Sequence, residues 1–143
     1  MTGFRPRKGR FVIEWYPKTA SEAFAKYDLV YSASGYLTKA DATSGDHIGV
    51  ILKTVAATDD DYASNTFVPV LVPMNPNAEW EVPVGTGTLT AAMVNEKYDL
   101  KDANEIDVSA TSKKVVTITR FISSSVAWVK INAMIGYGNV ATT

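Results

Sequence analysis

Two β-rich runs near the end of the chain, separated by a short serine loop, place the strongest constraint on the fold. The runs are Lys114–Ile122 (KVVTITRFI) and Val126–Ile135 (VAWVKINAMI), and Ser123–Ser125 lies between them. β-Branched and aromatic residues favour strands, and so short a loop joins neighbouring antiparallel strands. The sequence therefore predicts a β-hairpin here, within a larger sheet.

Side-chain alternation along the second run predicts which of its faces is buried, because successive side chains of a strand point to opposite faces. Trp128 lies in the middle of one face, beside Val126 and Met134. That face is either covered by a second sheet layer or the N-terminal segment, or it forms a contact patch for a partner. The opposite face is aliphatic throughout and is predicted to face the core: Ala127, Val129, Ile131, Ala133 and Ile135.

The rest of the chain repeats this pattern of short strands and turns. Helical signals are limited to one or two turns at Thr19–Lys26 and a short turn at Thr90–Asn95. Turn residues recur about every 8–12 residues, which is typical of barrels and sandwiches. The predicted fold is therefore all-β, a compact β-barrel or β-sandwich with an extended N-terminal arm and at most one short helix. The other predicted strands are Phe11–Tyr16, Tyr27–Ala33, His47–Ala56, Thr66–Val72 and Ala78–Val84.

Positive charge is concentrated in the first ten residues. The other 133 residues carry 10 basic and 15 acidic side chains. Two glycines and a proline leave the segment without a helical or alternating pattern. Residues 1–10 are therefore predicted to form a basic arm outside the core, and residues 11–143 a single all-β domain. The basic residues of the arm are Arg5, Arg7, Lys8 and Arg10.

Three roles for this arm are open: docking on an acidic protein surface, binding nucleic acid, or increasing solubility. The acidic remainder of the chain would repel a polyanion and has no second basic stripe. Docking on a protein is therefore the favoured role, and nucleic acid is a less favoured partner.

The residue patterns of known catalytic and ligand sites are missing. The single histidine, His47, follows Asp46 and opens an apolar run, without the G-x-S-x-G turn of a serine hydrolase. Acidic residues gather at Asp59–Asp61 and again from Asp99 to Asp107, without the spacing of a calcium loop. We therefore expect no enzyme activity, no catalytic residue, no metal site and no cofactor.

Composition and hydropathy also argue against a membrane or disulfide-bonded protein. The chain has no cysteine, which rules out disulfides and thiolate zinc sites. No apolar run approaches the roughly 20 residues that span a bilayer. The apolar stretch Phe11–Ile13 stops at Glu14, so no signal peptide is expected. We expect a cytosol-like site of synthesis and no membrane partner.

Five stretches, together covering roughly residues 27–135, carry a family resemblance. They are SASGYLTKA, HIGVILKTVAAT, FVPVLVP followed by EWEV, GTGTLTAAMVNEKYDL, and VVTITRFISSSVAWVKINA. In spacing and texture they resemble the small capsid decoration, or cement, proteins of tailed bacteriophages. The resemblance implies a β-barrel or β-sandwich module on the outside of the virion head at a symmetry axis, made in the cytoplasm of the host bacterium, which stabilises the expanded shell.

The partners implied by this resemblance are the major capsid protein and neighbouring copies of the same chain. Capsid docking would then use the cations of the arm, Arg5, Arg7, Lys8 and Arg10, with Trp128 as an anchor. The alternative is an OB-type nucleic-acid-binding module that uses the basic arm and exposed aromatic residues. Candidate aromatic residues for that role are Trp15, Tyr16 and Trp80.

Overall fold

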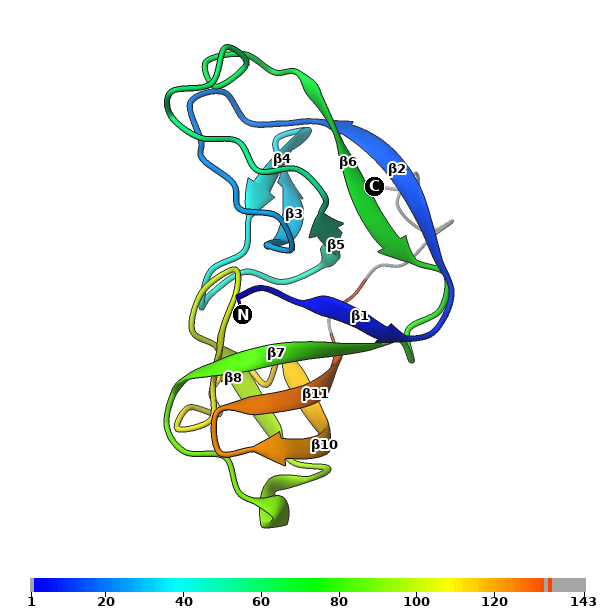
Figure 1. Cartoon of the computed structure of the whole chain (residues 1–143), viewed down its shortest axis with the longest axis vertical. Coiled ribbons are helices and arrows are strands. Elements are labelled where there is room, and N and C mark those ends of the chain that lie inside the picture. Colours follow the sequence, from blue (N-terminus) through cyan, green and yellow to red (C-terminus); the bar gives the residue numbers. More distant parts are fainter. Residues whose placement is uncertain (1, 133, 135–143) are drawn as a thin grey trace.

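The computed structural model describes residues 2–132 and 134, and it consists of two β-sheets (Figure 1). In the described residues the helical content is one 3-10 turn, η1 (Ala91–Met93), so the all-β prediction is confirmed. The first sheet has the order β1 (Arg5–Lys8), β7 (Glu79–Thr86), β11 (Val126–Ile131), β10 (Val116–Ser123), β8 (Lys97–Leu100) and β9 (Ile106–Asp107). The second has the order β2 (Phe11–Pro17), β6 (Phe67–Pro73), β5 (His47–Ile51), β3 (Leu29–Ala33) and β4 (Tyr36–Lys39).

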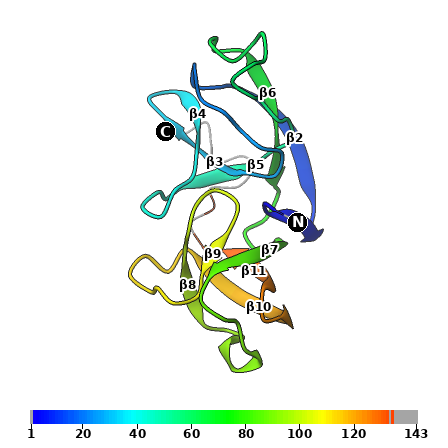
Figure 2. The same cartoon turned by 60° about the vertical axis from the view of Figure 1, so that its left-hand side comes forward.

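β9 closes the first sheet into a barrel. It pairs antiparallel with β8 and parallel with β7, so that β7, β11, β10, β8 and β9 form a mixed ring, to which β1 adds along β7. The second sheet is antiparallel throughout. Figures 1 and 2 show the barrel below the second sheet, with β1 between them. No helix in the described ranges is long and apolar enough to cross a membrane.

Two clusters of buried apolar side chains form the core. The first fills the barrel and extends to residues of the second sheet, so the two sheets pack directly against each other; it includes Trp80, Val82, Ile118 and Val129 from the barrel and Leu29 and Val50 from the second sheet. The second cluster lies against one face of the second sheet and includes Val30, Ile48, Val68, Val70 and Val72.

The predicted core face of the last hairpin is confirmed wherever the structure describes it. Ala127, Val129 and Ile131 are all buried. Ala133 and Ile135, assigned to the same face, lie outside the described residues. The strand predicted at Ala78–Val84 is β7, and its alternating residues Trp80, Val82 and Val84 pack into the barrel core.

The N-terminal segment is extended, as expected, but the prediction that it stays outside the core is wrong. Phe4 is fully buried in the barrel cluster, and its backbone N–H donates to the carbonyl of Tyr27 at 2.9 Å. Arg5–Lys8 is the strand β1, antiparallel to β7. The physical reason is that an edge of β7 was available to a strand, and Phe4 contributes an aromatic side chain to the core beside it.

The helical turns predicted at Thr19–Lys26 are also absent. The backbone of Phe24 instead exchanges hydrogen bonds with Val55, at 2.9 and 2.8 Å. Ser21 has a φ of 58°, which interrupts a right-handed helix. Glu22 accepts a hydrogen bond from the backbone N–H of Lys39 at 2.8 Å. Pairing with distant segments has therefore overridden the local helical signal.

Gly49 lets two strands of the second sheet approach closely. A Cβ atom added at this position would lie 2.1 Å from the backbone oxygen of Leu71 in β6. A backbone oxygen in a sheet cannot move aside as a flexible side chain can, so only glycine fits here. The position lies on β5, at the centre of the sheet order.

Replacing Gly49 with alanine is expected to lower the free energy of unfolding by about 1–3 kcal/mol, because the methyl group overpacks the β5–β6 contact. Urea denaturation measures this loss. Gly45→Ala is the matched control, since no atom lies within 4 Å of its added Cβ. The control is expected to stay within about 0.5 kcal/mol of the wild type. Equal losses in both variants would contradict the steric explanation.

Candidate docking surface

A row of polar and aromatic side chains crosses the outside of the barrel from β1 to β10. Arg5 lies opposite Glu81 in the β1–β7 register, Glu81 lies opposite Trp128, and Trp128 lies opposite Arg120. Because the neighbouring residues of β7 and β11 face the core, Glu81 and Trp128 must point outward. Four strands thus bring distant parts of the sequence into one surface row.

Glu81 is the centre of this row. The guanidinium of Arg7 donates from Nε and from Nη2 to its two carboxylate oxygens, each at 3.2 Å. The indole Nε1 of Trp128 donates to the same carboxylate at 3.0 Å. The guanidinium of Arg120 lies over the indole ring of Trp128, with its central carbon 4.8 Å from the ring centroid. The half-buried indole is therefore held in one orientation by a hydrogen bond and by a cation–π contact.

Electrostatics support the charged form of Glu81. The hydrogen bonds from Arg7 hold the pKa of Glu81 below its ordinary value; partial burial acts in the opposite direction, and the bond from Trp128 adds to the lowering. The same contact raises the pKa of Arg7. The network is therefore fully ionised at neutral pH.

A second row runs beside the first. The Nζ of Lys8 lies 3.6 Å from a carboxylate oxygen of Glu79, and the hydroxyl of Thr119 donates to Glu79 at 2.7 Å. Lys130 lies opposite Glu79 in the β7–β11 register. The two glutamates of β7 thus form ion pairs with the cations of β1 and hold these side chains in fixed positions along the strand. We call the surface formed by Arg7, Lys8, Arg120 and Trp128 the barrel face.

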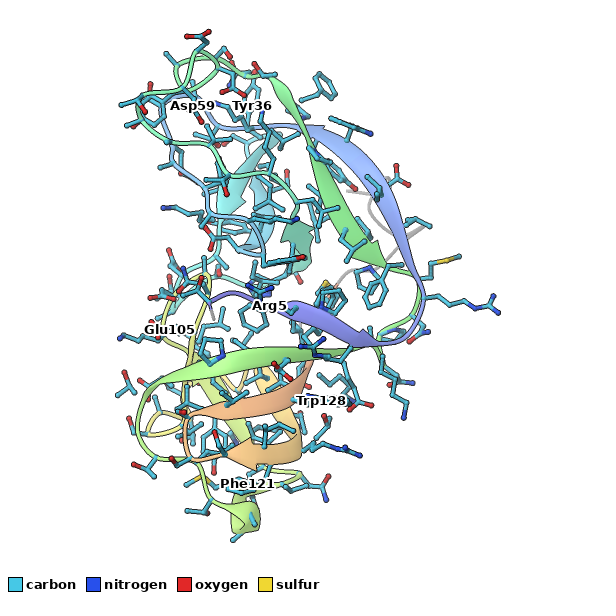
Figure 3. All side chains as sticks on the ribbon, viewed as in Figure 1. Arg5, Tyr36, Asp59, Glu105, Phe121 and Trp128 are labelled. Carbon is cyan, nitrogen blue, oxygen red and sulfur yellow. The ribbon has the colours of Figure 1, made fainter. Side chains whose placement is uncertain are left out.

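The four predicted docking cations are not all in one place. Arg7 and Lys8 lie with Trp128 on the barrel face. Arg5 lies between the two sheets (Figure 3), with its guanidinium 4.6 Å from the ring centroid of Tyr27 and a buried Nε that has no hydrogen-bond partner. Arg10 is exposed, and no described residue binds its side chain.

Arg120, Glu79 and Glu81 were not identified as site residues from the sequence. The alternation in AEWEVPV does place both glutamates on the outer face of their strand. Their role depends on β1 pairing with β7, which joins residues more than 70 positions apart. No local pattern reports such a pairing.

The barrel face ends in an apolar tip on β10. Phe121 is 39% exposed and Ile122 is 45% exposed. The β10–β11 register shifts between Phe121 and Ser123, which is a β-bulge. Figure 3 shows Phe121 toward the lower end of the barrel, below Trp128. The register places Phe121 opposite the buried Ala127, so Phe121 leaves β10 on the opposite side from Trp128, and the apolar tip adjoins the ordered polar row at the end of the hairpin.

A second exposed apolar surface lies on the other sheet. Ile13 and Trp15 on β2 are 56% and 60% exposed, and Phe67 on β6 is 58% exposed. Pro69, half-buried, lies opposite Trp15 in the β2–β6 register. We call these four residues the β2–β6 face. It is on a different sheet from the barrel face, so the described residues expose apolar side chains on two separate surfaces.

The residues considered for catalysis or metal binding have structural partners. His47 is buried in β5, and its Nε2 lies 3.0 Å from the hydroxyl of Ser44. Asp59 accepts the backbone N–H of Ala56 at 2.8 Å, and Asp61 pairs with Lys53 at 2.8 Å. Within residues 2–132 and 134, no group of three or more histidine, aspartate or glutamate side chains could hold a metal ion.

Comparison with known proteins adds no assignment to this surface. No protein-family model matches the chain, and no curated protein matches its sequence. The arrangement of the barrel face is suited to binding, because it holds an aromatic ring and several cations in fixed positions, with no nucleophile–base pair among them.

The Trp128–Glu81 hydrogen bond is expected to follow the ionisation of Glu81. Because the pKa of Glu81 is lowered, the contact should be complete above the ordinary glutamate pKa of about 4.3 and should be lost as the pH falls through the lowered value. The indole Nε1–H resonance of Trp128, followed by NMR from about pH 6 to about pH 2, should shift only in the acidic part of that range.

Arg7→Gln provides the control for this titration, because it removes the largest cause of the lowered pKa while leaving Trp128 in place. Its midpoint should lie at higher pH than that of the wild type. A Trp128 resonance that is insensitive to pH, or an unchanged midpoint in Arg7→Gln, would contradict the geometry.

Proposed function

We propose that this chain is a structural virion protein that binds the outer surface of a phage head and clamps adjacent subunits of the major capsid protein. The observation that carries the proposal is the separation of exposed apolar side chains into two surfaces, the tip of the barrel face and the β2–β6 face. Figure 1 shows that the strands concerned, β10 on one side and β2 and β6 on the other, lie in different parts of the molecule. A molecule with two adhesive surfaces can hold two neighbours at once. The sequence resemblance to decoration proteins supports the same role.

The composition of the barrel face favours a protein partner. Tryptophan and arginine are the residue types that most often dominate binding energy at protein interfaces. Trp128 is already fixed by Glu81 and Arg120, so little rotamer entropy is lost when it is covered. The guanidinium of Arg120, which forms no ion pair within the described residues, complements an acidic surface and would steer the encounter.

Clamping needs no catalytic step, and none is proposed: the chain acts as a binding protein without enzyme activity or cofactor. Each contact can be modest, because many copies act together on one particle and each engages more than one subunit. Any expansion or loss of a subunit must then break these contacts as well, which stabilises the assembled shell by linkage.

The nucleic-acid alternative is less favoured by the geometry. Phosphate binding needs several free cations along a path. On β1, Arg7 and Lys8 face the carboxylates of Glu81 and Glu79, which already neutralise much of their charge. The remaining cation of the segment with an exposed side chain is Arg10, and a single cation is a weak basis for polyanion binding.

The first test is density-gradient sedimentation of a lysate from the native source, with this chain detected across the fractions. Many copies should co-migrate with very large particles. A chain confined to the light fractions at low salt would overturn the proposal, and binding to an oligonucleotide at low salt would then favour the alternative.

The second test uses point variants on particles that lack the chain. Deleting residues 1–10 is unsuitable, because Phe4 and β1 belong to the fold. Arg120→Glu and Trp128→Ala should each weaken attachment about tenfold, as expected of residues worth about 1–2 kcal/mol at an interface. Lys113→Glu makes the same charge change at an exposed position away from the barrel face and should attach normally. Normal attachment of all three variants would exclude the barrel face as the docking surface.

A further inference from the structure

We propose that the open edge of β2 is a self-association surface, through which two copies of the chain pair antiparallel and join their second sheets into one. This surface is separate from the barrel face. Ile13 and Trp15 also belong to the β2–β6 face, but self-association is measured on the isolated chain, so its failure and the failure of capsid docking are distinguishable. It rests on the backbone of β2, its exposed side chains and its unpaired charges.

The backbone of β2 has hydrogen-bonding groups directed away from the sheet. β2 is the first strand in the sheet order, with β6 on one side. The N–H of Met74 donates to the carbonyl of Arg10, and the N–H of Lys18 donates to that of Thr66. Along an antiparallel pair, every second residue forms backbone hydrogen bonds with the partner strand. Since Arg10 and Lys18 are bonded, the even-numbered residues of β2 are those that bond to β6. The odd-numbered residues Phe11, Ile13 and Trp15 consequently direct their N–H and C=O groups to the open side.

The open stretch is bounded at its far end. There the parallel pairing of Lys18 with Leu37 connects the chain to β4, and Pro17 has no N–H to donate. Figures 1 and 2 both show β2 along the outside of the molecule, with β6 on its inner side. The available edge is therefore the segment from Phe11 to Trp15.

Within residues 2–132 and 134, the edge from Phe11 to Trp15 has no lysine, proline, bulge or covering strand. Natural edge strands are commonly blunted by a lysine, a proline, a bulge or a covering segment. The β2–β6 register is continuous from Phe11 to Pro17, and Ile13 and Trp15 expose more than half of their side-chain surface. A regular apolar edge of this kind is a template for another strand.

Charge complementarity identifies a second copy as the occupant. Arg10 and Glu14 lie on the same side of β2 and, within the described ranges, neither side chain has an ion pair or hydrogen bond. An antiparallel pair centred on Ile13 places Ile13 opposite its counterpart and Phe11 opposite Trp15 of the second copy. Arg10 then lies diagonal to Glu14 of the second copy, within reach of a long side chain. The two-fold axis forms this ion pair twice.

This pairing also satisfies all the backbone N–H and C=O groups that the edge directs outward. In the register centred on Ile13, each of Phe11, Ile13 and Trp15 exchanges both backbone hydrogen bonds with the other copy. A register centred on Glu14 would instead place two carboxylates against each other, which is unfavourable. Sequence and edge geometry thus favour one self-complementary arrangement.

The full-length chain should be dimeric by sedimentation equilibrium, and Ile13→Lys should weaken the dimer at least tenfold, because a lysine on the edge is a device that prevents strand pairing. Ile122→Lys makes the same chemical change on the barrel face and should leave the dimer intact. Circular dichroism and urea unfolding would verify that both variants remain folded. A monomeric wild type, or a dimer that Ile13→Lys does not weaken, would overturn the proposal.

A charge exchange tests the two-fold pairing itself. Arg10→Glu and Glu14→Arg should each weaken the dimer, because each places like charges across the two-fold axis. The double variant Arg10→Glu/Glu14→Arg should restore it. If the single variants weaken the dimer and the double variant does not restore it, the proposed two-fold arrangement is wrong. If the wild type is monomeric and Ile13→Lys still reduces attachment to shells, the edge binds a strand of another protein and self-association is excluded, while the docking role is retained.

Discussion

The pairing of β1 with β7 is the contact on which the arrangement of the two sheets depends. β1 belongs to the barrel and β2 to the second sheet, and only Gly9 and Arg10 separate them. Once Phe4 is buried in the barrel core and β1 is bonded to β7, the start of β2 is fixed beside the barrel. The ring of Phe11 then contacts Trp80 edge-on, 5.1 Å between centroids, which continues the barrel core up to the second sheet.

The same pairing accounts for a basic segment on a chain of nearly neutral charge. β7 presents Glu79 and Glu81 on its outer face, and β1 brings Lys8 and Arg7 to them. These exposed ion pairs contribute little to stability. Their main effect is on order, since Glu81 also fixes the indole of Trp128. A charge cluster that suggests a flexible arm in sequence is therefore part of an ordered surface, in which the acidic partners come from the middle of the chain.

How far the sequence predicts this molecule depends on the range of the interactions involved. Strands with clear alternation, such as Glu79–Thr86 and Val126–Ile131, were predicted with the correct buried face, because a period of two is a local property. The segment around Phe24 was not, because its bonds to Val55 outweigh a weak helical preference. Of the residues proposed for docking, Arg7, Lys8 and Trp128 lie close together, but Glu81, which joins Arg7 to Trp128, could be recognised only once three strands were aligned.

The rigidity of the exposed apolar residues is what makes a binding role physically reasonable. Ile13, Trp15 and Phe67 lie on paired strands, and Phe121 lies on β10, where it is paired with Ala127 of β11. Exposed apolar side chains on flexible loops would lose conformational entropy on binding, whereas side chains on strands have already lost most of it during folding. The free energy of covering them is then available for association. A small cysteine-free domain can in this way expose two apolar surfaces, because each is supported from behind by its own cluster of buried apolar side chains.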